Sequence, residues 1–196
     1  MDNEADAVVQ RCLELSEEQC RRQEATPELK AAWEQLWRDT LAGERLAHSA
    51  IRHACMVLSL GASIAVAEGD YARSVELLRS YFAHPDIENA QCECRASLGC
   101  NLADSLLHLG EEAEALALYR QVLNSDNKPC AAKALAFARE FVRDFCLEQE
   151  ATAVASPALT GFVAEVAERS APGVAGQLPP AASYGQLAQT LSEAGG

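Results

Sequence analysis

The chain has 196 residues, which is enough for one domain with a sizeable core, and its 49% hydrophobic content is typical of a globular protein. Its formal net charge of −13 repels phosphate backbones and anionic lipid, so nucleic acid and membrane surfaces are disfavoured as partners. No apolar run reaches the roughly 20 residues of a membrane span, and the acidic start MDNEADAVVQ lacks the apolar stretch of a secretory signal. We therefore expect a cytoplasmic protein without membrane insertion.

Helical periodicity dominates as far as residue 148, and glycine and proline mark the joints. Thr26 followed by Pro27 is an N-cap residue with a first-turn proline, which indicates a helix start. Gly69 and Gly110 end helices, and Asp70 can cap the helix that follows it. No alternating run predicts a strand, so the expected fold class is all-α. The predicted helices cover 3–23, 27–43, 45–68, 70–83, 87–109, 111–124 and 129–149.

The composition changes after residue 149. The segment 150–196 holds six of the 11 glycines and four of the seven prolines but no cysteine. Two amphipathic pieces remain inside it, at 157–170 and 182–194. We therefore predict a helical domain over 1–149 and a partly ordered Ala/Gly/Pro-rich tail over 150–196 with one or two docking helices. The piece at 182–194 either occupies the binding groove until a partner displaces it, or belongs to a disordered tail or docks in a neighbouring subunit.

Two stretches of the chain resemble each other: AEGDYARSVELLRSYF at 67–82 and HLGEEAEALALYRQVL at 108–123. Each has a glycine, an acidic residue and then an amphipathic helix, and each glycine has an alanine seven positions before it, Ala62 or Ala103. Small side chains allow two antiparallel helices to approach closely, and glycine permits the sharp reversal between them. The pattern therefore predicts repeated helical hairpins.

This spacing resembles the tetratricopeptide repeat. The best-fitting stretch, 96–129, matches that pattern at Leu102, Ala103, Gly110, Ala115, Tyr119 and Pro129. A second stretch, 55–86, matches at Ala62, Gly69 and Tyr71 but has Ser74 where alanine is usual and Leu78 where an aromatic is usual. The two turn glycines lie 41 residues apart, against about 34 in that family. A plain helical bundle with similar hairpins is the alternative.

The resemblance implies a short right-handed α-solenoid, whose concave groove is lined by the first helix of each hairpin and holds a peptide or helix of a partner protein. One subgroup of the family clamps chaperone C-termini with basic residues and asparagines. Here only Asn101 occupies a clamp-type position, which disfavours that function. The groove positions carried over from the family are Met56, Ser59, Ser63, Val66, Ala67, Ser97, Cys100, Asn101, Asp104, Leu107 and His108.

Trp33 and Trp37 lie four residues apart on one helix face. They are either core residues or an exposed hot spot for a partner. The C-x-C-x5-C pattern of Cys92, Cys94 and Cys100 does not fit a zinc site, because helical positions two apart point in different directions. Buried cysteines that pack as small hydrophobic residues explain the pattern better, so no metal is expected.

No nucleophile elbow, phosphate-binding glycine loop or paired histidine motif is present in the sequence. We therefore expect no enzymatic activity and no cofactor. The predicted function is protein–protein interaction, as an adaptor, scaffold, assembly factor or complex subunit. The alternatives are a dedicated chaperone that shields a client segment and, more remotely, an enzyme with an unrecognised motif. Self-association through the 129–149 helix also stays open.

Overall fold

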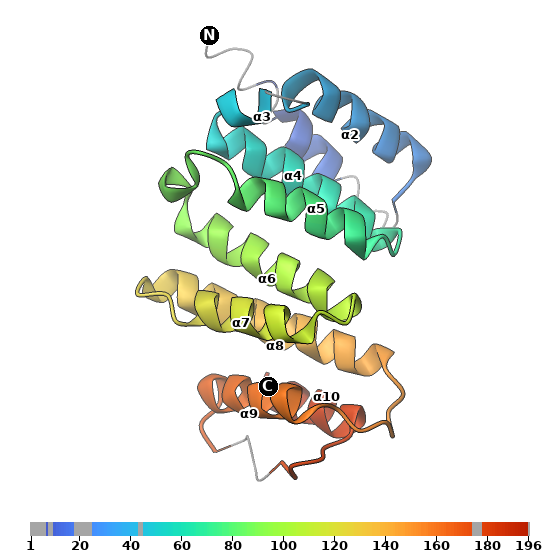
Figure 1. Ribbon diagram of the computed structural model, residues 1–196, viewed down its shortest axis with the longest axis vertical. Coiled ribbons are helices and arrows are strands. Elements are labelled where there is room, and N and C mark those ends of the chain that lie inside the picture. The colour runs from blue at the N-terminus through green and yellow to red at the C-terminus, as the bar shows by residue number, and fades with distance from the viewer. Residues whose placement is uncertain (1–6, 8–9, 18–24, 43–44, 174–177, 196) are drawn as a thin grey trace. The chain divides into compact units, whose positions relative to one another are not determined.

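The computed structural model describes residues 7, 10–17, 25–42, 45–173 and 178–195 (Figure 1). Apart from an isolated bridge between Val154 and Ser183, the regular structure of these residues is helical, which confirms the all-α prediction. The chain forms two compact units, residues 1–94 and 95–196, called here the first and second unit. Besides a helical stretch over 10–17, the elements are α2 (Pro27–Thr40), α3 (Arg45–His48), α4 (Ile51–Ala67), α5 (Tyr71–Phe82), η1 (Ile87–Asn89), α6 (Cys92–His108), α7 (Glu112–Leu123), α8 (Lys128–Glu148), α9 (Pro157–Ser170) and α10 (Tyr184–Glu193).

The predicted helix starts are confirmed where local capping chemistry defines them. The Thr26 hydroxyl accepts a hydrogen bond from the Leu29 amide at 3.2 Å, with Pro27 in the first turn. Asp70 accepts a hydrogen bond from the Arg73 amide at 3.0 Å. Each cap satisfies an amide that has no partner inside the helix.

Two predicted helix boundaries are wrong. The continuous helix expected over 45–68 is interrupted, because α3 ends at His48 and α4 begins at Ile51 after an extended Ala50. The helix expected over 87–109 starts as the short 3-10 helix η1, and α6 begins only at Cys92. Of the predicted helix 3–23, residues 10–17 are helical, while 3–6, 8–9 and 18–23 lie outside the described residues.

The two glycine turns have the same construction. Gly69 and Gly110 have φ angles of +74° and +78°, which glycine adopts without steric cost. After Gly69, the Asp70 amide donates to the Ala65 carbonyl at 2.8 Å, and after Gly110 the Glu111 amide donates to the Leu106 carbonyl at 2.9 Å. Both turns therefore end the preceding helix in a Schellman arrangement, which is the reversal that the sequence predicts.

The core of the first unit is built on α4. This helix packs against α5 along its length and against α2 (Figure 1). Trp33 of α2 is buried, and its indole N–H donates a hydrogen bond of 2.8 Å to the Val57 carbonyl of α4. Its ring occupies the space beside Gly61, where a Cβ atom would lie 2.2 Å from Trp33 Cζ2. Trp33 is therefore a core residue.

The core of the second unit is built on α8, which contacts α7, α9 and α10 (Figure 1). Tyr119 of α7 is fully buried and stacks on Phe162 of α9, with ring centroids 5.4 Å apart. Both amphipathic pieces of the predicted tail are helical, as α9 and α10, and their apolar side chains are buried. Leu187 of α10 has no exposed surface, and Tyr184 contacts the Phe145 ring of α8 edge-on.

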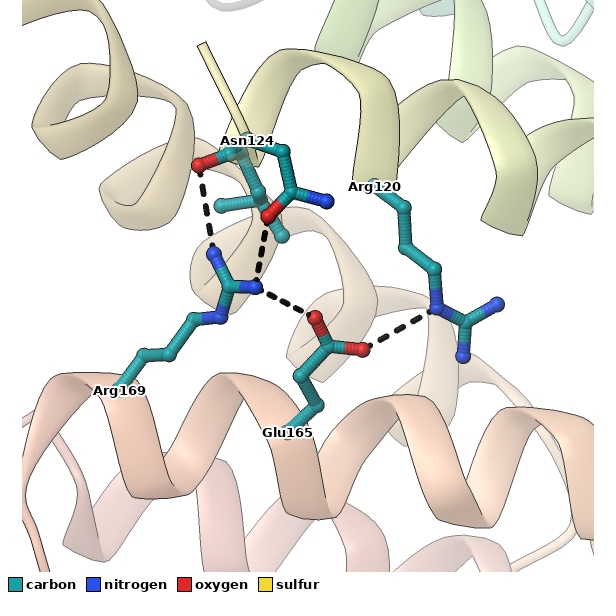
Figure 2. Close-up of polar contacts among 5 residues, drawn as sticks. Arg120, Asn124, Glu165 and Arg169 are labelled. Carbon is teal, nitrogen blue, oxygen red and sulfur yellow. Dashed lines mark hydrogen bonds and ion pairs between the residues drawn. The ribbon is translucent and has the colours of Figure 1, made fainter. Parts of the chain in front are cut away.

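A network of charged side chains joins α7 to α9 (Figure 2). Glu165 accepts hydrogen bonds from Arg120 at 3.1 Å and from Arg169 at 2.8 Å. Arg169 also donates to the Asn124 side chain at 2.9 Å and to the Leu123 carbonyl at 3.3 Å at the end of α7. The carboxylate of Glu165 therefore holds two arginines in place between neighbouring helices.

We expect Glu165→Gln to lower the free energy of unfolding by about 1 kcal/mol, since both ion pairs are partly exposed to solvent. The measurement is urea denaturation at low ionic strength. The matched control is Glu140→Gln on α8, which removes one exposed carboxylate. Equal stability of the two variants would show that the network contributes nothing to stability.

Candidate functional site

Five of the predicted groove residues lie on α4 in the first unit. Ser63 and Ala67 are exposed, whereas Met56, Ser59 and Val66 are half-buried. The Ser59 hydroxyl donates to the Met56 carbonyl at 3.1 Å, within the same helix. The side of α4 that carries these residues is therefore small and weakly polar, and Ser63 lies in its middle.

The other six predicted groove residues lie on α6 within the second unit. Cys100 is fully buried and Leu107 is 3% exposed, so both contribute to packing in this structure rather than to an apolar contact surface. The Cys100 thiol donates to the Ala134 carbonyl of α8 at 3.7 Å. The half-buried members of the set are Ser97, Asn101, Asp104 and His108.

Asp104 and His108 lie together with an acidic residue of α8. Asp104 Oδ1 is 3.8 Å from His108 Nε2, and His108 Nδ1 is 3.7 Å from Glu148 Oε2. The His108 ring also meets the Phe145 ring edge-on, at 5.2 Å between centroids. Asp104 and His108 are 16% and 12% exposed as side chains, so they are not solvated surface residues.

The electrostatics of this cluster are unusual. The pKa of Asp104 is raised to about 7, mainly by burial and to a smaller extent by the carboxylates of Glu148 and Asp144 on α8. Burial lowers the pKa of His108, against the opposing effect of Glu148, so the imidazole is neutral at neutral pH. Asp144 is itself paired with the Arg143 guanidinium, at 2.7 and 2.9 Å, and the ion-pair partner that the structure gives Asp104 is the His108 imidazole.

Sequence reasoning found only part of this cluster. The spacing of four residues between Asp104 and His108 was visible on one helix face. Glu148, Asp144 and Phe145 were missed because they come from α8, the predicted 129–149 helix, to which the sequence analysis assigned no groove residue. Their approach to α6 depends on tertiary packing, for which the sequence gives no local signal.

The first unit also has a cleft of about 320 Å³ beside α2. Trp37 lines it together with Trp33, and the two indole rings are stacked at 6.0 Å. Lys30 forms an ion pair of 2.8 Å with Glu68 at its edge. Trp33 is a core residue and is therefore not an exposed hot spot for a partner. Trp37 is half-buried and borders the cleft, so the hot-spot alternative stays open for this residue.

The cysteines of the C-x-C-x5-C pattern have different environments, and the expectation of buried thiols is wrong for Cys92, which is half-buried and disulfide-bonded. The Cys94 thiol lies beside the thiol of Cys55, which contributes to a pKa of Cys55 of about 12, although burial is the larger cause. Cys100 is buried on α6. Within the described residues, no group of three or more His, Cys, Asp and Glu side chains is placed to hold a metal ion.

Among the helices of the described ranges, none is long and apolar enough to span a bilayer. The chain matches no family model, no curated protein and no solved structure.

Proposed function

We propose that this chain is a protein-interaction module built from tetratricopeptide-like helical hairpins, and that it binds a peptide or amphipathic helix of a partner protein. Two surfaces are concerned, each within its own unit: the side of α4 that carries the exposed and half-buried predicted residues of the first unit, and the side of α6 that carries the half-buried predicted residues of the second unit. A cytoplasmic adaptor or complex subunit is the role that such a module fits.

The observation that carries this proposal is the cluster on α6 and α8. Asp104 is 16% exposed, and among the described residues its ion-pair partner is the imidazole of His108 at 3.8 Å, so a hydrogen-bond donor from a partner protein would favour the charged form of its carboxyl group. Such groups are commoner in binding sites than in well-packed structural surfaces. The matching Schellman turns after α4 and α6 give further support, because a repeat of helical hairpins needs such a chain reversal after the first helix of each pair.

The test is affinity capture from a native lysate with mass-spectrometric identification. The face variant carries Ser63→Arg on α4 and Ser97→Arg on α6. The matched control carries Ala72→Arg on α5 and Ala117→Arg on α7, which are exposed positions on the second helix of each hairpin. Leu107 is unsuitable for this purpose because it is buried.

We expect wild type and the control to capture the same protein in fixed stoichiometry, and the face variant to lose it. Two added arginines block a contact surface by bulk and charge alike. Circular dichroism shows whether all three chains are folded. If a folded face variant retains the partner, the binding surface is elsewhere and the proposal is wrong.

A further inference from the structure

The helix α10 packs on α8 and α9 through one apolar stripe (Figure 1). Leu187 and Leu191 are fully buried, and Ala188 beside them is 2% exposed. Tyr184 meets the Phe145 ring of α8 edge-on, with 6.2 Å between the ring centroids. Positions with this spacing share one face of a helix, as in an amphipathic helix that binds in a groove. α8 and α9 therefore present a helix-docking surface, and α10 is its occupant in this structure.

The polar side chains of α10 make their hydrogen bonds inside the helix. Gln189 donates to Glu193 at 2.9 Å, and the hydroxyls of Thr190 and Ser192 donate to carbonyls one turn earlier. Among the residues that the structure describes, no hydrogen bond or ion pair joins a side chain of α10 to another element. In contrast, Glu165 of α9 accepts a hydrogen bond from an arginine of α7 (Figure 2). α10 can therefore leave without breaking a polar side-chain contact, whereas α9 cannot.

Backbone hydrogen bonds fix the start of α10. The Ala155 amide donates to the Ala182 carbonyl at 3.0 Å, and the Tyr184 amide donates to the Ala153 carbonyl at 3.0 Å. Backbone bonds carry no side-chain specificity, so another chain in the same conformation can form them. The specificity of this surface therefore comes from the apolar stripe.

α10 is less firmly anchored than its neighbour α9. It has 10 residues, a length at which an isolated helix is marginal in water, so it depends on α8 and α9 to stay folded. Its fully buried large side chains are two leucines, whereas α9 buries Leu159, Phe162, Val163 and Val166 completely. Elements with fewer buried apolar contacts open at a lower free energy than the rest of a domain. We therefore expect α10 to open before α9.

We propose that α10 is an exchangeable occupant, and that an amphipathic helix of a partner protein displaces it from α8 and α9. That helix carries an aromatic residue with leucines three and seven positions after it, as Tyr184, Leu187 and Leu191 do. It has a small residue eleven positions after the aromatic one, because a Cβ atom at Gly195 would lie 3.3 Å from Arg139 Nε. The surface involves α8 and α9 rather than α4 and α6, so the inference goes beyond the proposed function.

The first measurement is amide hydrogen exchange of the isotope-labelled full chain, followed by NMR. We expect the amides of residues 187–191 in α10 to be protected at least about tenfold less than those of residues 163–167 in α9. An unlabelled peptide of residues 181–195 is then added as the probe. It should move the chain's own 187–191 signals toward those of an unfolded segment and leave the Arg120 side-chain signal unchanged. Equal protection of the two helices, or no displacement by the peptide, would overturn the inference.

The second measurement is the affinity of the same peptide for two variants of the full chain. Leu187→Ala weakens the attachment of α10 and should bind the peptide at least about tenfold more tightly than wild type, because more of the docking surface is free. The matched control Gln189→Ala changes an exposed residue of the same helix and should bind like wild type. A peptide with serine in place of both leucines should not bind. The inference is wrong if the two variants bind equally or if the serine peptide binds as well.

Circular dichroism shows whether the Leu187→Ala chain is folded. If it is not, the exchange and displacement measurements on wild type decide the inference. Light scattering detects a second copy of the chain as the occupant: dimers of the full chain that the peptide dissociates would show that α10 is exchanged between copies, and the proposal of a partner helix would be wrong. The lysate capture with Ser63→Arg and Ser97→Arg decides the proposed function separately from these outcomes.

Discussion

Gly61→Ala is expected to lower the free energy of unfolding by about 2–3 kcal/mol, a large effect for one added methyl group. The new Cβ atom would lie 2.2 Å from Cζ2 and 2.4 Å from Cε2 of Trp33. The indole cannot swing away cheaply, because it is buried and its N–H is bonded to the Val57 carbonyl. Chemical denaturation, with fluorescence of the two tryptophans as the signal, measures this loss.

The same substitution at Gly161 is the matched control. Gly161 lies within α9, and a Cβ atom there meets nothing within 4 Å. Replacing a helical glycine by alanine without a clash should stabilise the chain by about 0.5–1 kcal/mol, so the two variants should move in opposite directions. Combining Gly61→Ala with Trp33→Leu should cost less than the sum of the single changes. Additive losses would contradict the contact between Gly61 and Trp33.

Asp104→Asn is expected to stabilise the protein at about pH 8 by on the order of 4 kcal/mol and to have little effect near pH 4. The pKa of Asp104 is raised in the folded chain from 3.8 to about 7. The stability that the neutral Asp104 side chain contributes is therefore fully present at a pH below its pKa in the unfolded chain, and it is lost as the pH rises through about 7, the pKa in the folded chain. Asparagine keeps the shape of the side chain but never acquires the charge that burial disfavours.

Urea denaturation of wild type and variant across this pH range measures the effect, and the difference between the two chains isolates Asp104. The titratable and charged groups around it are Cys100 and His108 on α6, Tyr119 on α7, and Glu148 and the Arg143–Asp144 pair on α8, and they are common to both chains. Glu140→Gln should show no comparable pH-dependent gain. A stability difference between the two chains that does not change with pH would contradict the raised pKa of Asp104 in the folded chain.

Features that depend on local chemistry could be predicted from the sequence. Thr26 and Asp70 cap helices because a side-chain oxygen reaches an amide three residues ahead. Gly69 and Gly110 adopt positive φ angles that suit glycine, and they end α4 and α6 as expected. The break at Ala50 could not be predicted in this way, since neither glycine nor proline is present and no side chain caps α4.

Features that depend on tertiary contacts could not be predicted from the sequence. The periodicity of α2 placed Trp33 on an apolar face but could not pair it with Gly61. Asp104 and His108 were both predicted as groove residues on one helix. The contacts of His108 with Phe145 and Glu148 come from α8, so the sequence of α6 could not predict them. The packing of α9 and α10 was underestimated for the same reason. An Ala/Gly/Pro-rich composition indicates a mobile segment, but α10 packs against α8 and buries residues such as Leu187.

The most direct test of the site is the titration of the Asp104 side chain itself, followed by the carboxyl carbon signal in NMR of the full chain. The structure predicts a pKa of about 7, because the carboxyl group is buried and the carboxylates of Glu148 and Asp144 act on it. A pKa near the ordinary value of about 4 in the free chain would show that Asp104 is well solvated or already paired, and would contradict the site.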